Sequence, residues 1–168
     1  MWKRHLSFSI SFGLIAALNL AVEFFDISDA RLILKPLICL ILAGYLANKT
    51  RLTGNFSKLI FVGLLFSLVG DTALIFANKG GTYFLAGLGA FLVAHIAYSI
   101  AFFRDYRYNQ EASKKYGHFM LIALAIFTMG IYLWIRPYLN DMKLPVLVYM
   151  FFISVMAILA GYRYGRVN

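Results

Sequence analysis

The hydrophobic positions of this chain form long continuous runs, not the alternating or half-polar patterns of soluble domains. Six such runs lie at residues 6–25, 32–47, 59–77, 83–103, 119–135 and 144–162. A helix needs roughly 20 residues to cross a hydrocarbon core of about 30 Å. Backbone polar groups in lipid must also be satisfied within the protein. The pattern therefore predicts an all-α, polytopic transmembrane helix bundle with six spans.

The alternative membrane architecture, a β-barrel, would show apolar and polar residues alternating over segments of about ten residues. The six runs are continuous instead. The first run follows Met-Trp-Lys-Arg-His and resembles a signal peptide, but it is long and lacks a clear cleavage site, so we expect a retained first helix. Short connections favour antiparallel neighbours. We expect residues 1–168 to form a single transmembrane domain.

The composition and charge pattern agree with this class. Of the 168 residues, 62% are hydrophobic and 14% are charged. The net charge of +9 does not indicate a nucleic-acid partner, because the basic residues gather at the ends and in the connections. Eleven Lys and Arg residues lie on the side of the termini and four on the other side. The positive-inside rule then predicts cytoplasmic termini, and we expect a multi-pass protein of the bacterial inner (plasma) membrane.

Two polar residues interrupt neighbouring runs. Asp71 is the one charged residue of the third run, and His95 lies in the fourth. A charge at the centre of the bilayer costs about 2.5–3.5 kcal/mol on insertion scales, so ionisable residues there are usually functional. Structural roles stay open, because Asp71 can pair helices and a neutral His95 can bridge them. These two residues are the first candidates for chemistry.

Other charged residues lie near the outer ends of the same helices. At about 1.5 Å per residue, Asp71 lies roughly 9 Å and His95 roughly 18 Å from the outer ends of their helices. Glu23 and Lys35 lie about one turn inside the first and second helices. One outward-opening polar pocket could hold all four side chains. Lys35 could instead snorkel to the interface, and Pro36 after it should loosen the start of that helix.

Helical periodicity groups further residues with these candidates. Residues on one predicted face of the third helix are Ser67, Asp71 and Asn78, and those on a stripe of the fourth are Phe91, His95, Tyr98 and Phe102. On the fourth helix, Ala86, Ala90 and Ala94 form a row of small residues suited to close helix contact. Tyr98 and Tyr149 are more often packing residues. Concentrated polar faces indicate a lined cavity.

Familiar catalytic signatures are missing from the sequence. It has no G-x-S-x-G elbow, no P-loop and no H-E-x-x-H motif. Cys39 is the one cysteine and lies in an apolar run, so the chain can form no internal disulfide. A three-histidine zinc site is disfavoured because His95 is the one histidine within a run, and we expect neither metal nor cofactor. Acid–base chemistry by a carboxyl group and an imidazole remains.

At these same helices the sequence resembles the YhhN-like family of lysoplasmalogenases. Four segments carry the likeness: Lys35-Pro36, then Gly70-Asp71 with Leu74 (GDxxL), then GLGAFLVAHIAY at 87–98, and a looser match at 149–157. The third segment is similar to the pattern G-x-x-x-F-x-x-x-H-x-x-Y of the family. The likeness follows the order of the chain over nearly its whole length.

The resemblance implies an integral membrane enzyme that hydrolyses the vinyl ether bond of lysoplasmalogens. The products would be a fatty aldehyde and glycerophosphocholine or glycerophosphoethanolamine. Lys35, Asp71 and His95 match the functional positions of the family, with Tyr98 as a weaker addition. Members usually continue through two further helices with a second intramembrane Asp, so the resemblance implies a member shortened after the sixth span.

Vinyl ether hydrolysis suits the candidate residues. It needs a general acid, a negative group near the developing cation and a positioned water. We expect Asp71 and His95 to be catalytic, and Lys35, Glu23, Tyr98 and Asn78 to bind the lysophospholipid substrate. A small transporter that uses the same charged pocket is an alternative, although the two halves show no convincing repeat. A non-catalytic lipid-binding protein is a third possibility.

Overall fold

A computed structural model describes the backbone of residues 2–25, 28–108 and 114–162. Within these ranges, it leaves the side chains of residues 2–11, 23, 28–29, 106–108, 114–117 and 120 undescribed. The described α-helices are α1 (Trp2–Phe24), α2 (Ser28–Thr50), α3 (Asn55–Ile75), α4 (Gly81–Tyr108), α5 (Lys114–Ile135) and α6 (Lys143–Gly161). Three short 3-10 helices follow α3 and α5, namely η1 (Ala77–Lys79), η2 (Arg136–Tyr138) and η3 (Asn140–Met142).

The predicted all-α class is confirmed, because the described part of the chain contains helices and no strand. Five helical segments are long and apolar enough to cross a membrane: 30–50, 55–75, 81–105, 121–138 and 140–161. They make the chain a multi-pass integral membrane protein. The described apolar part of α1, Phe12–Val22, is shorter. Six spans with cytoplasmic termini therefore stay a prediction.

Several helices extend beyond the apolar runs from which they were predicted. α2 begins at Ser28 and ends at Thr50, whereas the run covers residues 32–47. Polar residues can continue a helix past the hydrocarbon boundary, because its backbone hydrogen bonds are internal. Pro36 accordingly lies inside α2 and not at its start, and it removes the bond that its N–H would give to the carbonyl group of Leu32.

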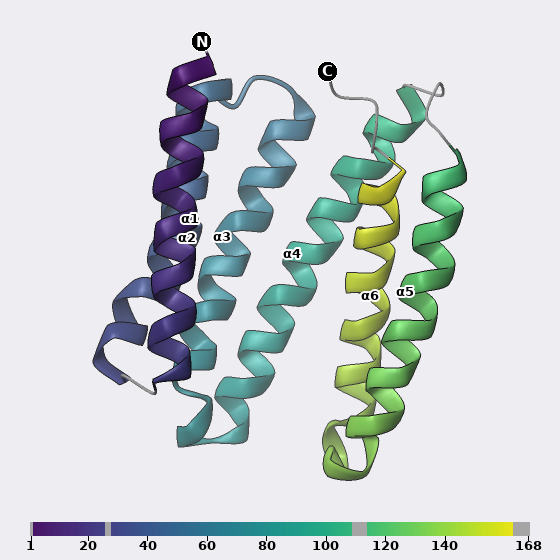
Figure 1. The fold of residues 1–168 in the computed structure, drawn as a ribbon. Coiled ribbons are helices and arrows are strands. Elements are labelled where there is room, and N and C mark those ends of the chain that lie inside the picture. Colours follow the sequence, from purple (N-terminus) through teal and green to yellow (C-terminus); the bar gives the residue numbers. More distant parts are fainter. Residues whose placement is uncertain (1, 26–27, 109–113, 163–168) are drawn as a thin grey trace.

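The helices form a row in which neighbours in sequence are mostly neighbours in space (Figure 1). α1 packs against α2, α2 against α3 and α3 against α4. The order then changes, since α4 packs against α6, and α5 lies outside α6. α1 begins and α6 ends at the same end of the bundle (Figure 1). Because α6 packs directly against α4, it can contribute side chains to a site on α4.

Small residues bring α3 and α4 close together. Ala94 and Ala101 of α4 are fully buried and Ala97 is nearly so, whereas Ala86 is exposed. The predicted alanine row is therefore wrong at Ala86. The buried alanines of α4 are Ala94, Ala97 and Ala101, a set that the spacing of alanines alone does not reveal.

Candidate active site between α2, α3, α4 and α6

Glycines of α3 make room for aromatic side chains of α4. A Cβ atom at Gly63 would lie 2.2 Å from Cε1 of Tyr98, and one at Gly70 would lie 2.7 Å from Cδ2 of Phe91. One turn further, a Cβ atom at Gly87 of α4 would lie 2.7 Å from Cδ2 of Leu74. These three contacts follow one antiparallel register. The GDxxL and G-x-x-x-F-x-x-x-H-x-x-Y segments are therefore two halves of one helix interface.

This interface fixes the orientation of His95. The side chain lies between Phe91 and Tyr98 on α4 and is only 7% exposed. Its Nδ1 atom donates a hydrogen bond to the backbone carbonyl group of Phe91, because a carbonyl oxygen can only accept. In the neutral imidazole, Nε2 then carries the lone pair. His95 is thus held in the tautomer that can take up a proton at Nε2.

Asp71 faces the second helix. The thiol group of Cys39 donates a hydrogen bond to its Oδ2 atom, with 3.2 Å between sulfur and oxygen. Lys35, one turn before Cys39 on α2, interacts electrostatically with the same carboxyl group. Asp71 lies four residues before the end of α3. The Asp71 carboxyl group, near one end of α3, therefore has a thiol hydrogen-bond donor and an ammonium group as neighbours.

Tyr149 of α6 connects the two candidates. Its ring packs edge-to-face on His95, with centroids 5.3 Å apart and planes at 85°. It also interacts electrostatically with Asp71. Tyr98 packs on His95 as well, with centroids 6.4 Å apart, and its hydroxyl group shares a hydrogen bond of 3.2 Å with Ser67. Together with Cys39 and Lys35 of α2, Asp71, His95 and the two tyrosines form one cluster with contributions from four helices.

The structure brings together some of the predicted residues and separates others. Lys35, Asp71, His95 and Tyr98 belong to this cluster, but no hydrogen bond joins Asp71 to His95 among the described residues. Asn78 lies in η1, beyond the end of α3, and is exposed. Glu23 is in α1, and its side chain lies outside the described residues. The predicted link between Asp71 and His95 runs through aromatic neighbours.

Sequence reasoning missed two members of the cluster, Cys39 and Tyr149. Cys39 lies four residues after Lys35 and therefore on the same face of α2, which could have drawn attention to it. Tyr149 begins the looser family match at 149–157, but a tyrosine in an apolar run is more often a packing residue. In the part of the chain that the structure describes, no three His, Cys, Asp or Glu side chains are arranged to hold a metal ion. The cluster offers acid–base chemistry.

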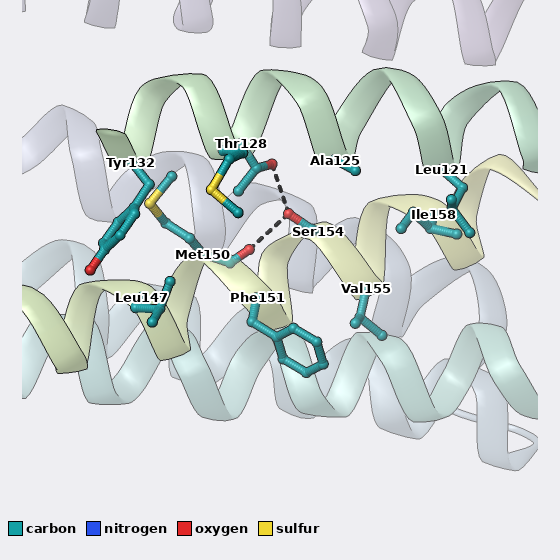
Figure 2. A pocket seen from close by; sticks show the side chains of 11 residues that line it. Leu121, Ala125, Thr128, Tyr132, Leu147, Met150, Phe151, Ser154, Val155 and Ile158 are labelled. Carbon is teal, nitrogen blue, oxygen red and sulfur yellow. Dashed lines mark hydrogen bonds between the residues drawn. The ribbon is translucent and has the colours of Figure 1, made fainter. Parts of the chain in front are cut away.

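A separate apolar groove of about 290 Å³ lies between α5 and α6. Figure 2 shows Thr128 of α5 facing Ser154 of α6, and a hydrogen bond of 2.9 Å joins their hydroxyl groups. At about 100° of turn per residue, Leu147, Phe151 and Ile158 of this groove lie roughly opposite Tyr149 around α6. The groove and the Asp71–His95 cluster are therefore on different sides of α6.

Comparison with known proteins gives a family match over most of the chain and a short local match to a human protein. A model of the YhhN family matches residues 30–168. Human lysoplasmalogenase TMEM86A is 54% identical over 43 residues, which cover 26% of this chain and 17% of the human protein. The matched segment thus spans about a sixth of that relative. No solved structure matches the chain.

Proposed function

This chain belongs to the YhhN family, and we propose that it is a membrane-embedded lysoplasmalogenase. It would hydrolyse the vinyl ether bond of a lysoplasmalogen to a fatty aldehyde and glycerophosphocholine or glycerophosphoethanolamine. The observation that carries the proposal is the cluster itself, in which a carboxyl group shares a site with an imidazole whose Nε2 has no hydrogen-bond partner among the described residues. The name of the human relative supports the same reaction.

Asp71 and His95 can supply and accept all the protons that the proposed reaction moves. Asp71, as the acid, gives its proton to the second carbon of the alkenyl chain, and the electron pair of the double bond forms the new C–H bond. The first carbon and the ether oxygen then share a positive charge, which the Asp71 carboxylate stabilises. Water attacks the first carbon and gives a proton to Nε2 of His95. The product of this step is a hemiacetal.

The hemiacetal then breaks down with the same two residues. Its hydroxyl group returns a proton to the Asp71 carboxylate while its carbon–oxygen bond to glycerol breaks. The electron pair stays on the glycerol oxygen, which takes the proton held by His95. An aldehyde and an alcohol leave, and both residues regain their starting forms. Because one water is consumed and no electrons are transferred, the reaction needs no redox partner.

The other predicted residues are proposed to hold the substrate. Lys35 can bind the phosphate group as a point charge, in line with its place beside Asp71. Tyr98 shapes the site through its contacts with Ser67 and His95. Asn78, exposed in η1, is proposed to contact the headgroup. Glu23 of α1 is proposed as a second headgroup contact. We place the opening of the site on the non-cytoplasmic side of the bacterial inner membrane.

The test is aldehyde release by the purified protein with a lysoplasmalogen, beside an ester-linked lysophospholipid of equal chain length. We expect aldehyde from the vinyl ether and no hydrolysis of the ester. Asp71→Asn should abolish turnover in a folded protein, whereas Asp141→Asn, at an exposed position of η3, should not. Near-normal turnover by Asp71→Asn would exclude Asp71 as the acid, and absence of aldehyde with the unaltered protein would exclude the reaction.

A further inference from the structure

We propose that the hydroxyl group of Tyr149 and Nε2 of His95 together hold the water that attacks the substrate. This inference rests on the proposed hydrolysis and adds Tyr149 to it as a catalytic residue that touches a reacting molecule. It assigns α6 a part in the chemistry. The contact that carries it is the edge-to-face packing of Tyr149 on His95 at 5.3 Å.

A reactive water inside a membrane protein needs polar partners. Buried waters make about three hydrogen bonds on average, and a site with fewer than two polar groups does not hold one. The hydrocarbon surroundings of α4 and α6 offer no alternative donors or acceptors. The water must therefore be held by side chains of the cluster that have hydrogen-bonding capacity left.

Most polar groups of the cluster are already engaged. The Tyr98 hydroxyl group is bonded to Ser67, the Cys39 thiol group donates to Asp71, and Nδ1 of His95 donates to the Phe91 carbonyl group. In the described part of the chain, no hydrogen bond is recorded for His95 Nε2 or for the Tyr149 hydroxyl group. These two groups, on side chains in contact, therefore have hydrogen-bonding capacity left for a water.

Tyr149 also links the two catalytic candidates. It packs on His95 and interacts electrostatically with Asp71. In the proposed step, the water held by the Tyr149 hydroxyl group and Nε2 attacks the carbon that Asp71 makes electrophilic. As the water attacks, its proton passes to Nε2, and the hydroxyl group of Tyr149 keeps a hydrogen bond to the water oxygen without any net change of its own.

Tyr149→Phe removes the hydroxyl group and keeps the ring on His95. We expect kcat for aldehyde release to fall by about 10- to 100-fold, with KM little changed. The first step should survive, because Asp71 still protonates the alkenyl carbon. With slow water capture, the cation rotates about its single bond between the first and second carbons and returns its original hydrogen, as a proton, to Asp71. In D₂O, substrate recovered from the variant should then carry deuterium at the second alkenyl carbon, whereas substrate recovered from the unaltered enzyme should carry little.

The isotope measurement separates this role from loss of folding, which would abolish both hydrolysis and exchange. Tyr132→Phe is the matched control, because Tyr132 lines the α5–α6 groove and not the cluster. It should match the unaltered enzyme in both measurements. Hydrolysis by Tyr149→Phe within about twofold of normal, or slow hydrolysis without deuterium uptake, would overturn the assignment. In either case aldehyde release by the unaltered enzyme would leave the proposed reaction standing.

Discussion

Cys39 donates its thiol hydrogen to Oδ2 of Asp71 over 3.2 Å and so joins α2 to α3 at the proposed acid. The thiol is only 7% exposed, so water does not compete with this bond to any large extent. The bond engages one carboxyl oxygen, Oδ2. In the proposed reaction Oδ1 faces the substrate, and the cysteine orients the carboxyl group without taking part in the transfer of protons.

Replacing Cys39 by Ala should weaken activity without abolishing it. The loss of one hydrogen bond to the carboxyl group is expected to lower kcat by about 2- to 10-fold. Cys39→Ser, which keeps a donor of similar size, should recover most of the activity. The measurement is the steady-state rate of aldehyde release, with thermal unfolding in detergent to confirm that both variants are folded. Equal activity of Cys39→Ala and the unaltered protein would contradict an orienting role.

The membrane helices and the two polar candidates within them could be predicted, because each depends on the composition of a single segment. Continuous apolar runs are sufficient to identify membrane helices, and the all-α class follows from them. Asp71 and His95 stand out because a polar group in an apolar run is costly. The family pattern around them also proved to follow one antiparallel helix interface, from Leu74 against Gly87 to Gly63 against Tyr98.

The contacts between helices could not be predicted in the same way. They depend on how each helix is rotated about its axis and on which helices are neighbours. Helices in lipid are apolar on nearly every side, so the sequence gives little sign of which face meets a neighbour. The position of Tyr149 beside His95 requires α6, and not α5, to pack on α4. The pairing of Cys39 with Asp71 likewise depends on the rotation of α2. Neither contact has a fixed spacing along the chain.

The hydroxyl pair between α5 and α6 should contribute to stability and not to catalysis. Thr128 and Ser154 share a hydrogen bond of 2.9 Å, and Ser154 also donates to the Met150 carbonyl group. A double-mutant cycle with Thr128→Val and Ser154→Ala should give a coupling of about 0.6 kcal/mol in unfolding free energy. Activity should stay within about twofold, since α6 separates this pair from the cluster. A large loss of activity in either single variant would link the groove to the site.

Gly63 is expected to tolerate no side chain. Alanine there would place Cβ 2.2 Å from the Tyr98 ring, which cannot move away without disturbing its bond to Ser67. Overpacking of this kind costs about 1–3 kcal/mol, so Gly63→Ala should unfold at lower temperature or denaturant concentration. Gly44→Ala in α2 is the matched control, because no atom lies within 4 Å of its Cβ position. Equal stability of the two variants would show that α3 and α4 are less close than described.

His95→Asn should separate the structural and chemical roles of the imidazole. The Asn amide can still donate to the Phe91 carbonyl group, as Nδ1 does, but it has no counterpart of the basic Nε2. We expect kcat to fall by about 10²- to 10⁴-fold, the usual contribution of a general base, while the unfolding temperature changes little. His118→Asn, at an exposed position of α5, should keep full activity. If His95→Asn retains more than about a tenth of the normal kcat, His95 serves the packing of α4 and α6, and another group must accept the proton of the attacking water.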